Sequence, residues 1–148
     1  MPSVTAEITV DAPVKTVYDI ARNIERFPEF MDDVVSVEIL EQTPERQVSR
    51  WKTLIKEFHR NLNWVEVDYW DEETRTCRWE LTEGDLKRYD GNWEFTETEG
   101  GGTRAKVHID YEIEVPLIGA LLKKIVRAKM QANVDSMLAA IKREAEAA

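Results

Sequence analysis

Apolar residues recur at helical spacing through the C-terminal part of the chain. They fall three or four positions apart, with one more beside them, as expected for one face of an amphipathic helix: Val126, Met130, Val134, Met137, Leu138, Ile141 and Ala145. An earlier apolar block at 118–125 is rotated away from this stripe on a helical wheel. The pattern predicts a long helix over 116–148, with a bend or break near Lys129 and a stripe that must be buried.

The chain before this helix alternates between apolar and polar residues with the period of half-buried strands. The clearest alternation covers 103–115 and places Tyr111 on the apolar face. Turn residues, such as Pro44 and the three glycines at 100–102, separate the alternating segments. The pattern predicts seven strands, at 4–10, 34–41, 47–55, 58–70, 75–83, 87–97 and 103–115.

Two short helices are predicted between the first and second strands. Val14, Val17, Tyr18 and Ala21 share one helical face, and Pro28 disturbs a second short segment. The element order predicts an α+β fold in which a seven-stranded antiparallel sheet wraps around the long C-terminal helix. The 148 residues are expected to form a single domain over 1–148. A functional site would then lie between the helix and the sheet.

Charge and composition exclude several classes of function. With 29 acidic and 20 basic residues the net charge is −9, which disfavours binding to nucleic acid or to anionic membrane surfaces. No apolar run is long enough to cross a bilayer, and residues 1–10 alternate instead of forming an apolar leader. We therefore expect a soluble, cytoplasmic protein that is not an integral membrane protein, and that is a monomer or a homodimer.

Soft metal ligands are scarce. His59, Cys77 and His108 do not have the spacing of a zinc site, so we expect no metal and no cofactor. A single cysteine cannot form an internal disulfide, which agrees with a reducing compartment.

The strand at 58–70 carries the most informative polar residues, but its two faces are about equally mixed. One face would hold Phe58, Arg60, Leu62, Trp64, Glu66 and Asp68; the other would hold His59, Asn61, Asn63, Val65, Val67 and Tyr69. If the first face points inward, Arg60 is expected to pair with Glu66 or another acid. Glu66 and Asp68 are then candidates for a general base or a polar anchor. The alternative is a solvated strand face or a structural ion pair.

Large aromatic and apolar residues are the candidates for contacts to a ligand. Four tryptophans lie within the predicted strands: Trp51, Trp64, Trp79 and Trp93. They serve either as core or as a platform for a ligand, and the hydroxyl of Tyr111 either has a partner in the core or donates to a ligand. Three further residues cluster on a turn after the short helices and either cap the core or gate a cavity: Phe27, Phe30 and Met31.

Several short stretches occur in order along the chain: 8–13 (Ile-Thr-Val-Asp-Ala-Pro), 17–19 (Val-Tyr-Asp), 23–30 (Asn-Ile-Glu-Arg-Phe-Pro-Glu-Phe), 37–40 (Val-Glu-Ile-Leu), 91–93 (Gly-Asn-Trp) and the glycine turn before the last strand. Together with the element order, they resemble the START-like helix-grip (SRPBCC) superfamily, and more narrowly its polyketide cyclase/dehydrase and coenzyme-Q-binding branch. The resemblance implies a deep cavity between helix and sheet that takes a lipid, a quinone or a polyketide-like molecule.

The resemblance also suggests roles for particular residues. The polyketide aromatase/cyclases have aromatic residues on the loop after the first helices and a tryptophan on the middle strand, which Phe27, Met31 and Trp64 match in type. The arginine that follows in that family falls on Asp68 here, and a carboxylate would repel an enolate that a guanidinium stabilises. On the terminal helix, Asn133 and Met137 are expected to face the cavity.

Three functions remain open from the sequence. We favour a protein that binds a small hydrophobic molecule. The first alternative is a cyclase/dehydrase that uses acid and base groups in the cavity, with five residues available: Arg60, Glu66, Asp68, Tyr111 and Asn133. The second alternative is a protein-interaction or regulatory module that acts through the outer surface.

Overall fold

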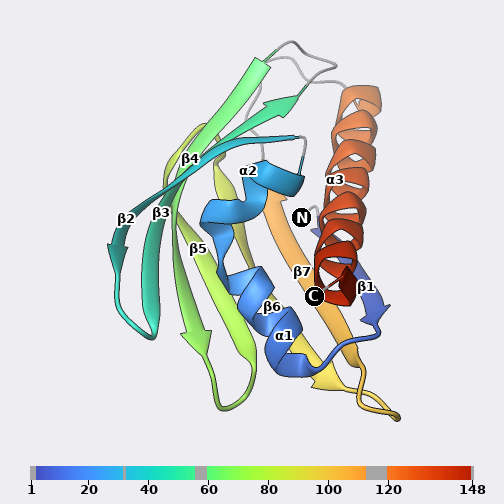
Figure 1. The fold of residues 1–148 in the computed structure, drawn as a ribbon. Coiled ribbons are helices and arrows are strands. Elements are labelled where there is room, and N and C mark those ends of the chain that lie inside the picture. Colours follow the sequence, from blue (N-terminus) through green and yellow to red (C-terminus); the bar gives the residue numbers. More distant parts are fainter. Residues whose placement is uncertain (1–2, 32, 56–59, 113–119, 148) are drawn as a thin grey trace.

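The computed structural model describes residues 3–31, 33–55, 60–112 and 120–147. Its elements follow the predicted order, with a 3-10 turn ahead of the second short helix (Figure 1). They are β1 (Ser3–Val10), α1 (Val14–Arg22), η1 (Ile24–Arg26), α2 (Phe27–Phe30), β2 (Val34–Gln42), β3 (Arg46–Ile55), β4 (Arg60–Asp71), β5 (Thr76–Gly84), β6 (Arg88–Glu97), β7 (Thr103–Glu112) and α3 (Ala120–Ala147).

The seven strands form one antiparallel sheet in the order β1-β7-β6-β5-β4-β3-β2. β2 to β7 follow one another as a meander, and β1 pairs with β7 and forms the edge of the sheet opposite β2. The sheet curves around α3, which packs against β1 and α1 (Figure 1). The predicted α+β helix-grip fold is therefore confirmed. No helix in the described ranges has the length and apolar character needed to span a membrane.

The terminal helix α3 runs without interruption from Ala120 to Ala147, so the break predicted near Lys129 is wrong. Instead of breaking, the helix leaves Ile125 of the earlier apolar block 39% exposed. The later stripe is buried: Leu138 and Ile141 are 2% and 0% exposed. An unbroken helix keeps its backbone hydrogen bonds, and exposing one isoleucine costs less than losing several of them.

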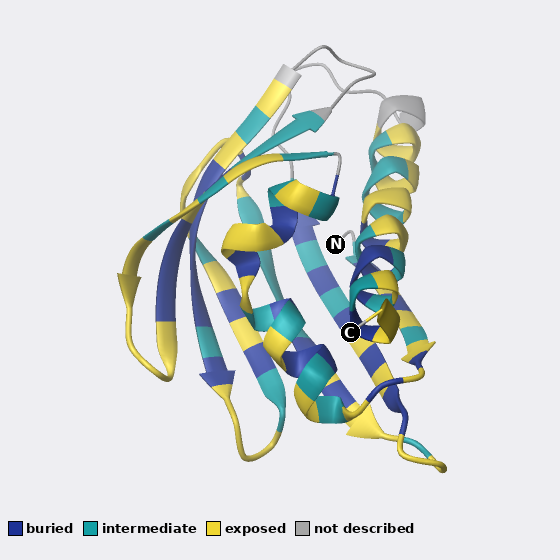
Figure 2. Ribbon diagram, viewed as in Figure 1, coloured by how far each residue is buried: buried dark blue, intermediate teal, exposed yellow. Residues whose placement is uncertain are grey.

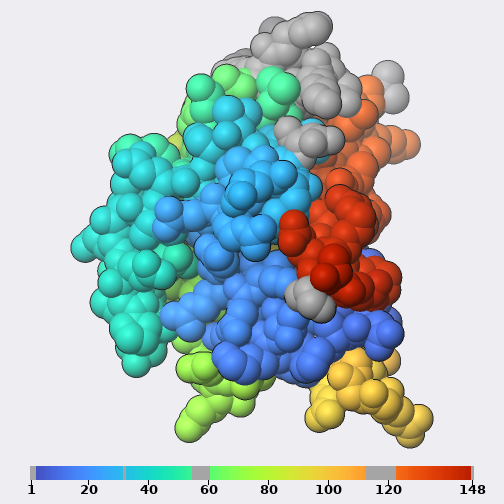
Figure 3. Space-filling view, in the orientation of Figure 1, coloured from blue at the N-terminus to red at the C-terminus, as the bar shows by residue number. Residues whose placement is uncertain are grey.

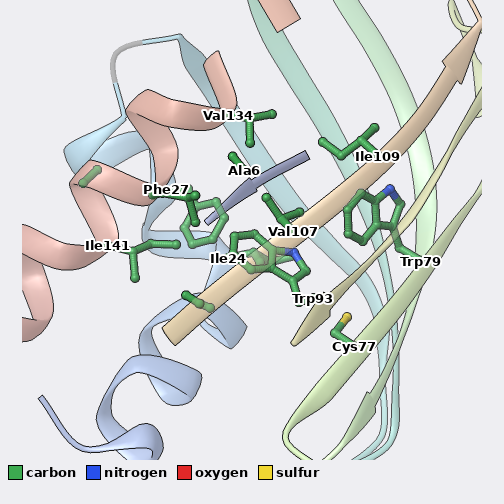
Figure 4. Close-up of a cluster of buried hydrophobic side chains, with 14 of the residues drawn as sticks. Ala6, Ile24, Phe27, Cys77, Trp79, Trp93, Val107, Ile109, Val134 and Ile141 are labelled. Carbon is green, nitrogen blue, oxygen red and sulfur yellow. The ribbon is translucent and has the colours of Figure 1, made fainter. Parts of the chain in front are cut away.

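The core lies between α3, the short helices and the inner face of the sheet. Burial alternates along the strands and follows one side of the helices (Figure 2). In the close-up, Val134 and Ile141 of α3 point toward Val107 of β7 and Phe27 of α2, with the indole of Trp93 on the sheet side (Figure 4). Burial of these side chains is what fixes the helix against the sheet.

The segment from α1 to α2 fills the face of the molecule between the β2–β3 hairpin and α3 (Figure 3). Tyr18 of α1 is fully buried and packs edge-on against Trp70 and Phe95, with ring centroids 5.4 and 5.8 Å away. These contacts hold α1 on the sheet, so the short helices cover one part of the inner face.

Replacing Ile141 by Ala should lower the free energy of unfolding by about 2–5 kcal/mol, because it leaves a cavity in a fully buried contact. Urea unfolding measures this loss. The matched control makes the same chemical change at Ile125→Ala on the exposed side of α3, where the cost should be below about 1 kcal/mol. Equal losses at the two positions would contradict the assignment of the buried face.

Candidate functional site

The structure decides which face of β4 points inward. Trp64 and Trp70 belong to the core and Leu62 packs against it. On the same face, Glu66 and Asp68 are 5% and 3% exposed. The outer face has an apolar cluster of its own: Val48, Val65, Val67 and Tyr69. That second cluster is why alternation alone could not distinguish the two faces.

Glu66 and Asp68 form a buried acid pair. Trp64 Nε1 donates a hydrogen bond of 2.8 Å to Glu66 Oε1, and the two carboxyl groups are hydrogen-bonded to each other. Burial raises the pKa of both groups, and the neighbouring Glu66 raises the pKa of Asp68 further. The pair therefore keeps a proton at a pH where exposed carboxyl groups are ionised, and it can both donate and accept hydrogen bonds.

Two buried polar residues of β3 lie beside the acid pair. Ser49 is the cross-strand neighbour of Glu66, and Gln47 is the neighbour of Asp68. Ser49 Oγ accepts a hydrogen bond of 2.9 Å from Trp51 Nε1, whereas Gln47 Oε1 has no hydrogen-bond partner among the described residues. Ser49, Gln47, Glu66 and Asp68 thus form one polar patch on the inner face. The first two were missed from the sequence, although both alternate in step with Trp51.

A row of aromatic rings runs along the same face. Trp51 stacks on its cross-strand neighbour Trp64, with centroids 5.7 Å apart and planes 4° apart. Tyr89 of β6 meets Trp64 at 5.2 Å and Trp79 of β5 at 5.9 Å. Phe27 of α2 meets Trp51 at 5.7 Å. The row surrounds the polar patch with apolar surface, and Tyr89 is the member that the sequence analysis did not single out.

Two glycines allow this row to form. A Cβ on Gly84 would lie 2.5 Å from Trp64 Cα, and its φ of 140° is a conformation that other residues rarely adopt. A Cβ on Gly91 would lie 2.1 Å from the carbonyl oxygen of His108 and 2.8 Å from the Trp79 ring. Both glycines therefore let the backbone approach the tryptophans of the site.

The other residues singled out from the sequence lie in different environments. Phe27 and Met31 are buried, Phe30 is half-buried, and Met137 is half-buried against the core. Trp93 stacks on Phe95, 5.5 Å away, and Tyr111 is buried on the inner face as its alternation predicted. Asn133 is exposed on α3. The Arg60 side chain lies outside the described residues.

Two surface pockets border the site. One, of about 500 Å³, opens on the outer face where β5 and β6 separate after the Trp79–Gly91 pair, and it is lined mainly by charged and polar side chains. The other, of about 210 Å³, lies between α1 and the β2–β3 hairpin and includes Gln47. Within the described ranges, no three potential metal ligands gather into a site. The cavity between α3 and the sheet stays a prediction.

The raised pKa values make stability depend on pH. The folded state binds more protons than the unfolded chain, so the acid pair should lower the stability as pH rises above about 4, by up to about 1.4 kcal/mol per pH unit for each proton. The free energy of unfolding of the double variant Glu66→Gln/Asp68→Asn should therefore rise relative to that of the wild type as pH increases. Urea unfolding at several pH values measures this difference.

The control for this experiment is Glu80→Gln, which removes an exposed carboxyl group from the outer face of β5. This variant keeps the buried pair, so its stability should fall with rising pH as that of the wild type does. A pH-independent difference between the wild type and the double variant would contradict the raised pKa values.

Comparisons with known proteins add to this geometry. A sequence profile of the family described as polyketide cyclase/dehydrase and lipid transport matches residues 10–138. The crystal structure of TTHA0849 from Thermus thermophilus has a TM-score of 0.92 at 35% identity, over 99% of this chain and 98% of that one. The Zhui aromatase/cyclase from Streptomyces sp. R1128 has a TM-score of 0.89 at 19% identity, over 98% and 93%, which shows likeness of fold. The ribosome association toxin RatA of Escherichia coli K12 is 23% identical over 89% of this chain and 84% of its own length.

Proposed function

The chain belongs to the polyketide cyclase/dehydrase and lipid transport family, and on that premise we propose that it binds a small hydrophobic or aromatic molecule between the sheet and α3. The superfamily resemblance noted from the sequence is thereby confirmed. The observation that carries the proposal is a buried aromatic surface interrupted by a polar patch with unpaired atoms.

The unpaired atoms are the main argument for a ligand. Gln47 Oε1 and Trp79 Nε1 are buried without a hydrogen-bond partner in the described part of the chain, and both residues are cross-strand neighbours of Asp68. Leaving such a group unpaired costs about 1–3 kcal/mol. A ligand with an apolar body and a few polar atoms would cover the rings and pair with these groups, which is how small-molecule sites are commonly built.

The acid pair supports a second candidate function, a cyclase/dehydrase. Such a reaction removes a proton from carbon and protonates a departing hydroxyl group, so it needs one group that accepts a proton and one that donates it. Glu66 and Asp68 are hydrogen-bonded to each other and hold a proton between them, which suits both roles. The resemblance puts Asp68 at the position of the arginine of the aromatase/cyclases, so stabilisation of an enolate would have to come from a protonated carboxyl group.

An interaction module remains the less favoured alternative. RatA is by its name a ribosome-associating toxin, but the net charge of −9 in this chain opposes direct contact with RNA. The buried polar patch has no role in a surface interaction, whereas it is accounted for by a ligand.

Native mass spectrometry of the purified protein, followed by solvent extraction, tests for a bound hydrophobic molecule. Whether or not one co-purifies, calorimetric titration with 1-naphthylmethanol should detect binding. Trp64→Ala should weaken that binding by about 1–3 kcal/mol, because the ring contributes apolar contact area. The matched control, Trp70→Ala on the same face of β4, removes a ring that packs beneath α1 and should leave the affinity unchanged. Unaltered affinity in Trp64→Ala would remove this residue from the site.

Single amide variants separate binding from catalysis. If the protein is a cyclase/dehydrase, Glu66→Gln and Asp68→Asn should each reduce turnover of an aromatic poly-ketone analogue by at least about a hundredfold, since general acid–base catalysis contributes that much. Binding of the analogue should be retained, because the amides keep the shape of the carboxyl groups. Turnover that is unaffected by either change would rule out a catalytic role for the pair.

A further inference from the structure

The charge of the acid pair is not neutralised by the part of the chain that the structure describes. No ion pair there includes Glu66 or Asp68, and no cation lowers the pKa of either group. The side chain of Arg60, which was expected to pair with Glu66 or another acid, lies outside the described residues. A compensating positive charge must come from elsewhere or be replaced by protons.

The patch is also rich in hydrogen-bond acceptors. Of the carboxyl oxygens of the pair, Glu66 Oε1 accepts from Trp64 Nε1, and Gln47 contributes an unpaired amide oxygen beside Asp68. Among the described residues, two buried indole donors on this face are unpaired: Trp79 Nε1, whose residue is the cross-strand neighbour of Asp68, and Trp70 Nε1, two residues along β4 beneath α1. The acceptors therefore call for a ligand group with several N–H donors, and Trp79 leaves a place for one ligand oxygen.

The surrounding rings add to the negative potential. The faces of tryptophan and tyrosine rings attract cations, most strongly where water is excluded. The cation–π contacts found among the described residues involve Trp70, Phe30, Tyr18 and Tyr69 and leave the row of Trp51, Trp64, Tyr89 and Trp79 without one. Carboxyl groups framed by such rings are a setting in which an organic ammonium group is stabilised by both kinds of contact.

From this geometry, and resting on the proposed function, we propose that the ligand of the inner face is an aromatic or polycyclic amine, whose ammonium group binds at Glu66 and Asp68 while its apolar body lies along the tryptophans. The ammonium N–H groups donate to the two carboxyl groups and to Gln47 Oε1. A site that prefers a cationic ligand differs from one that would bind a neutral lipid, a quinone or a poly-ketone.

Binding of an amine has a further consequence, the release of protons. A cation beside the pair favours its ionised form, so the pair loses protons when the amine binds and the affinity rises with pH. The other titratable groups that interact with the pair are Cys77 of β5 and Tyr89 of β6, and two cations, Arg22 of α1 and Arg78 of β5, act on Cys77 in turn. Burial, with a contribution from the two carboxyl groups, raises the pKa of Cys77 and Tyr89, so both stay neutral.

Three probes of the same shape test the proposal: 1-naphthylmethylamine, 1-naphthylmethanol and 1-naphthoate, titrated calorimetrically into the full-length protein. The amine should bind at least about tenfold more tightly than the alcohol, and the carboxylate should bind most weakly. In the double variant Glu66→Gln/Asp68→Asn the advantage of the amine over the alcohol should disappear. Glu80→Gln, which changes a carboxyl group on the outer face, should retain it.

Titration in two buffers of different ionisation enthalpy counts the protons that are released. Release on binding of the amine, but not of the alcohol, is expected for the wild type, and this measurement does not depend on the variants. Alcohol binding that equals or exceeds amine binding would overturn the proposal while leaving the proposed function standing. So would an amine preference that persists in the double variant. If none of the three probes binds, the proposed function itself is contradicted.

Discussion

The burial of two adjacent carboxyl groups on the inner face of the sheet is the constraint on which the site depends. Glu66 and Asp68 occupy positions that in an ordinary helix-and-sheet core would be apolar, and each is more than nine-tenths buried. Their desolvation is offset in part by the indole N–H of Trp64 and by the hydrogen bond between them. The remaining cost has to be recovered elsewhere, either in the core or from a bound molecule.

The fold tolerates the desolvation of the two carboxyl groups because its stability comes from other parts of the molecule. The buried stripe of α3 packs on β1, and α1 is held by Tyr18 against Trp70 and Phe95, so these contacts do not involve the acid pair. The sheet next to the pair is shaped by glycines instead: Gly84 lies against Trp64, and Gly91 lies against Trp79. The contacts that stabilise the fold are thus separate from the part of the inner face that carries the buried polar groups.

The sequence predicted the fold more completely than the site. Element order and strand alternation determine the sheet, because each strand buries one face and a register shift of one residue would expose it. The long helix was predicted, but the bend or break near Lys129 was not needed, since an unbroken helix can leave Ile125 exposed. Wheel geometry shows where apolar residues point, and it does not weigh one exposed side chain against several hydrogen bonds.

The site was harder to predict because its members come from four strands. Trp64, Glu66 and Asp68 were identified, but the inner face of β4 stayed open because Val65 and Val67 form a second apolar cluster outside. Gln47 and Ser49 are recognised as members of the site only from the cross-strand pairing of β3 with β4. A local sequence pattern does not reveal that pairing. Tyr89 enters the row in the same way, through its contacts with rings on two other strands.

The acid character of Asp68 and Glu66 links the energetics of the site to its chemistry. A guanidinium on this face would stabilise developing negative charge, whereas two carboxyl groups that share a proton stabilise positive charge or donate a proton. Because no cation among the described residues lowers the pKa of Glu66 or Asp68, the two carboxyl groups and the faces of the rings dominate the local potential. A chain can therefore keep the fold that it shares with an aromatase/cyclase while it changes the potential of its inner face, since the fold rests on α3 and the core and the potential rests on a few inner-face side chains.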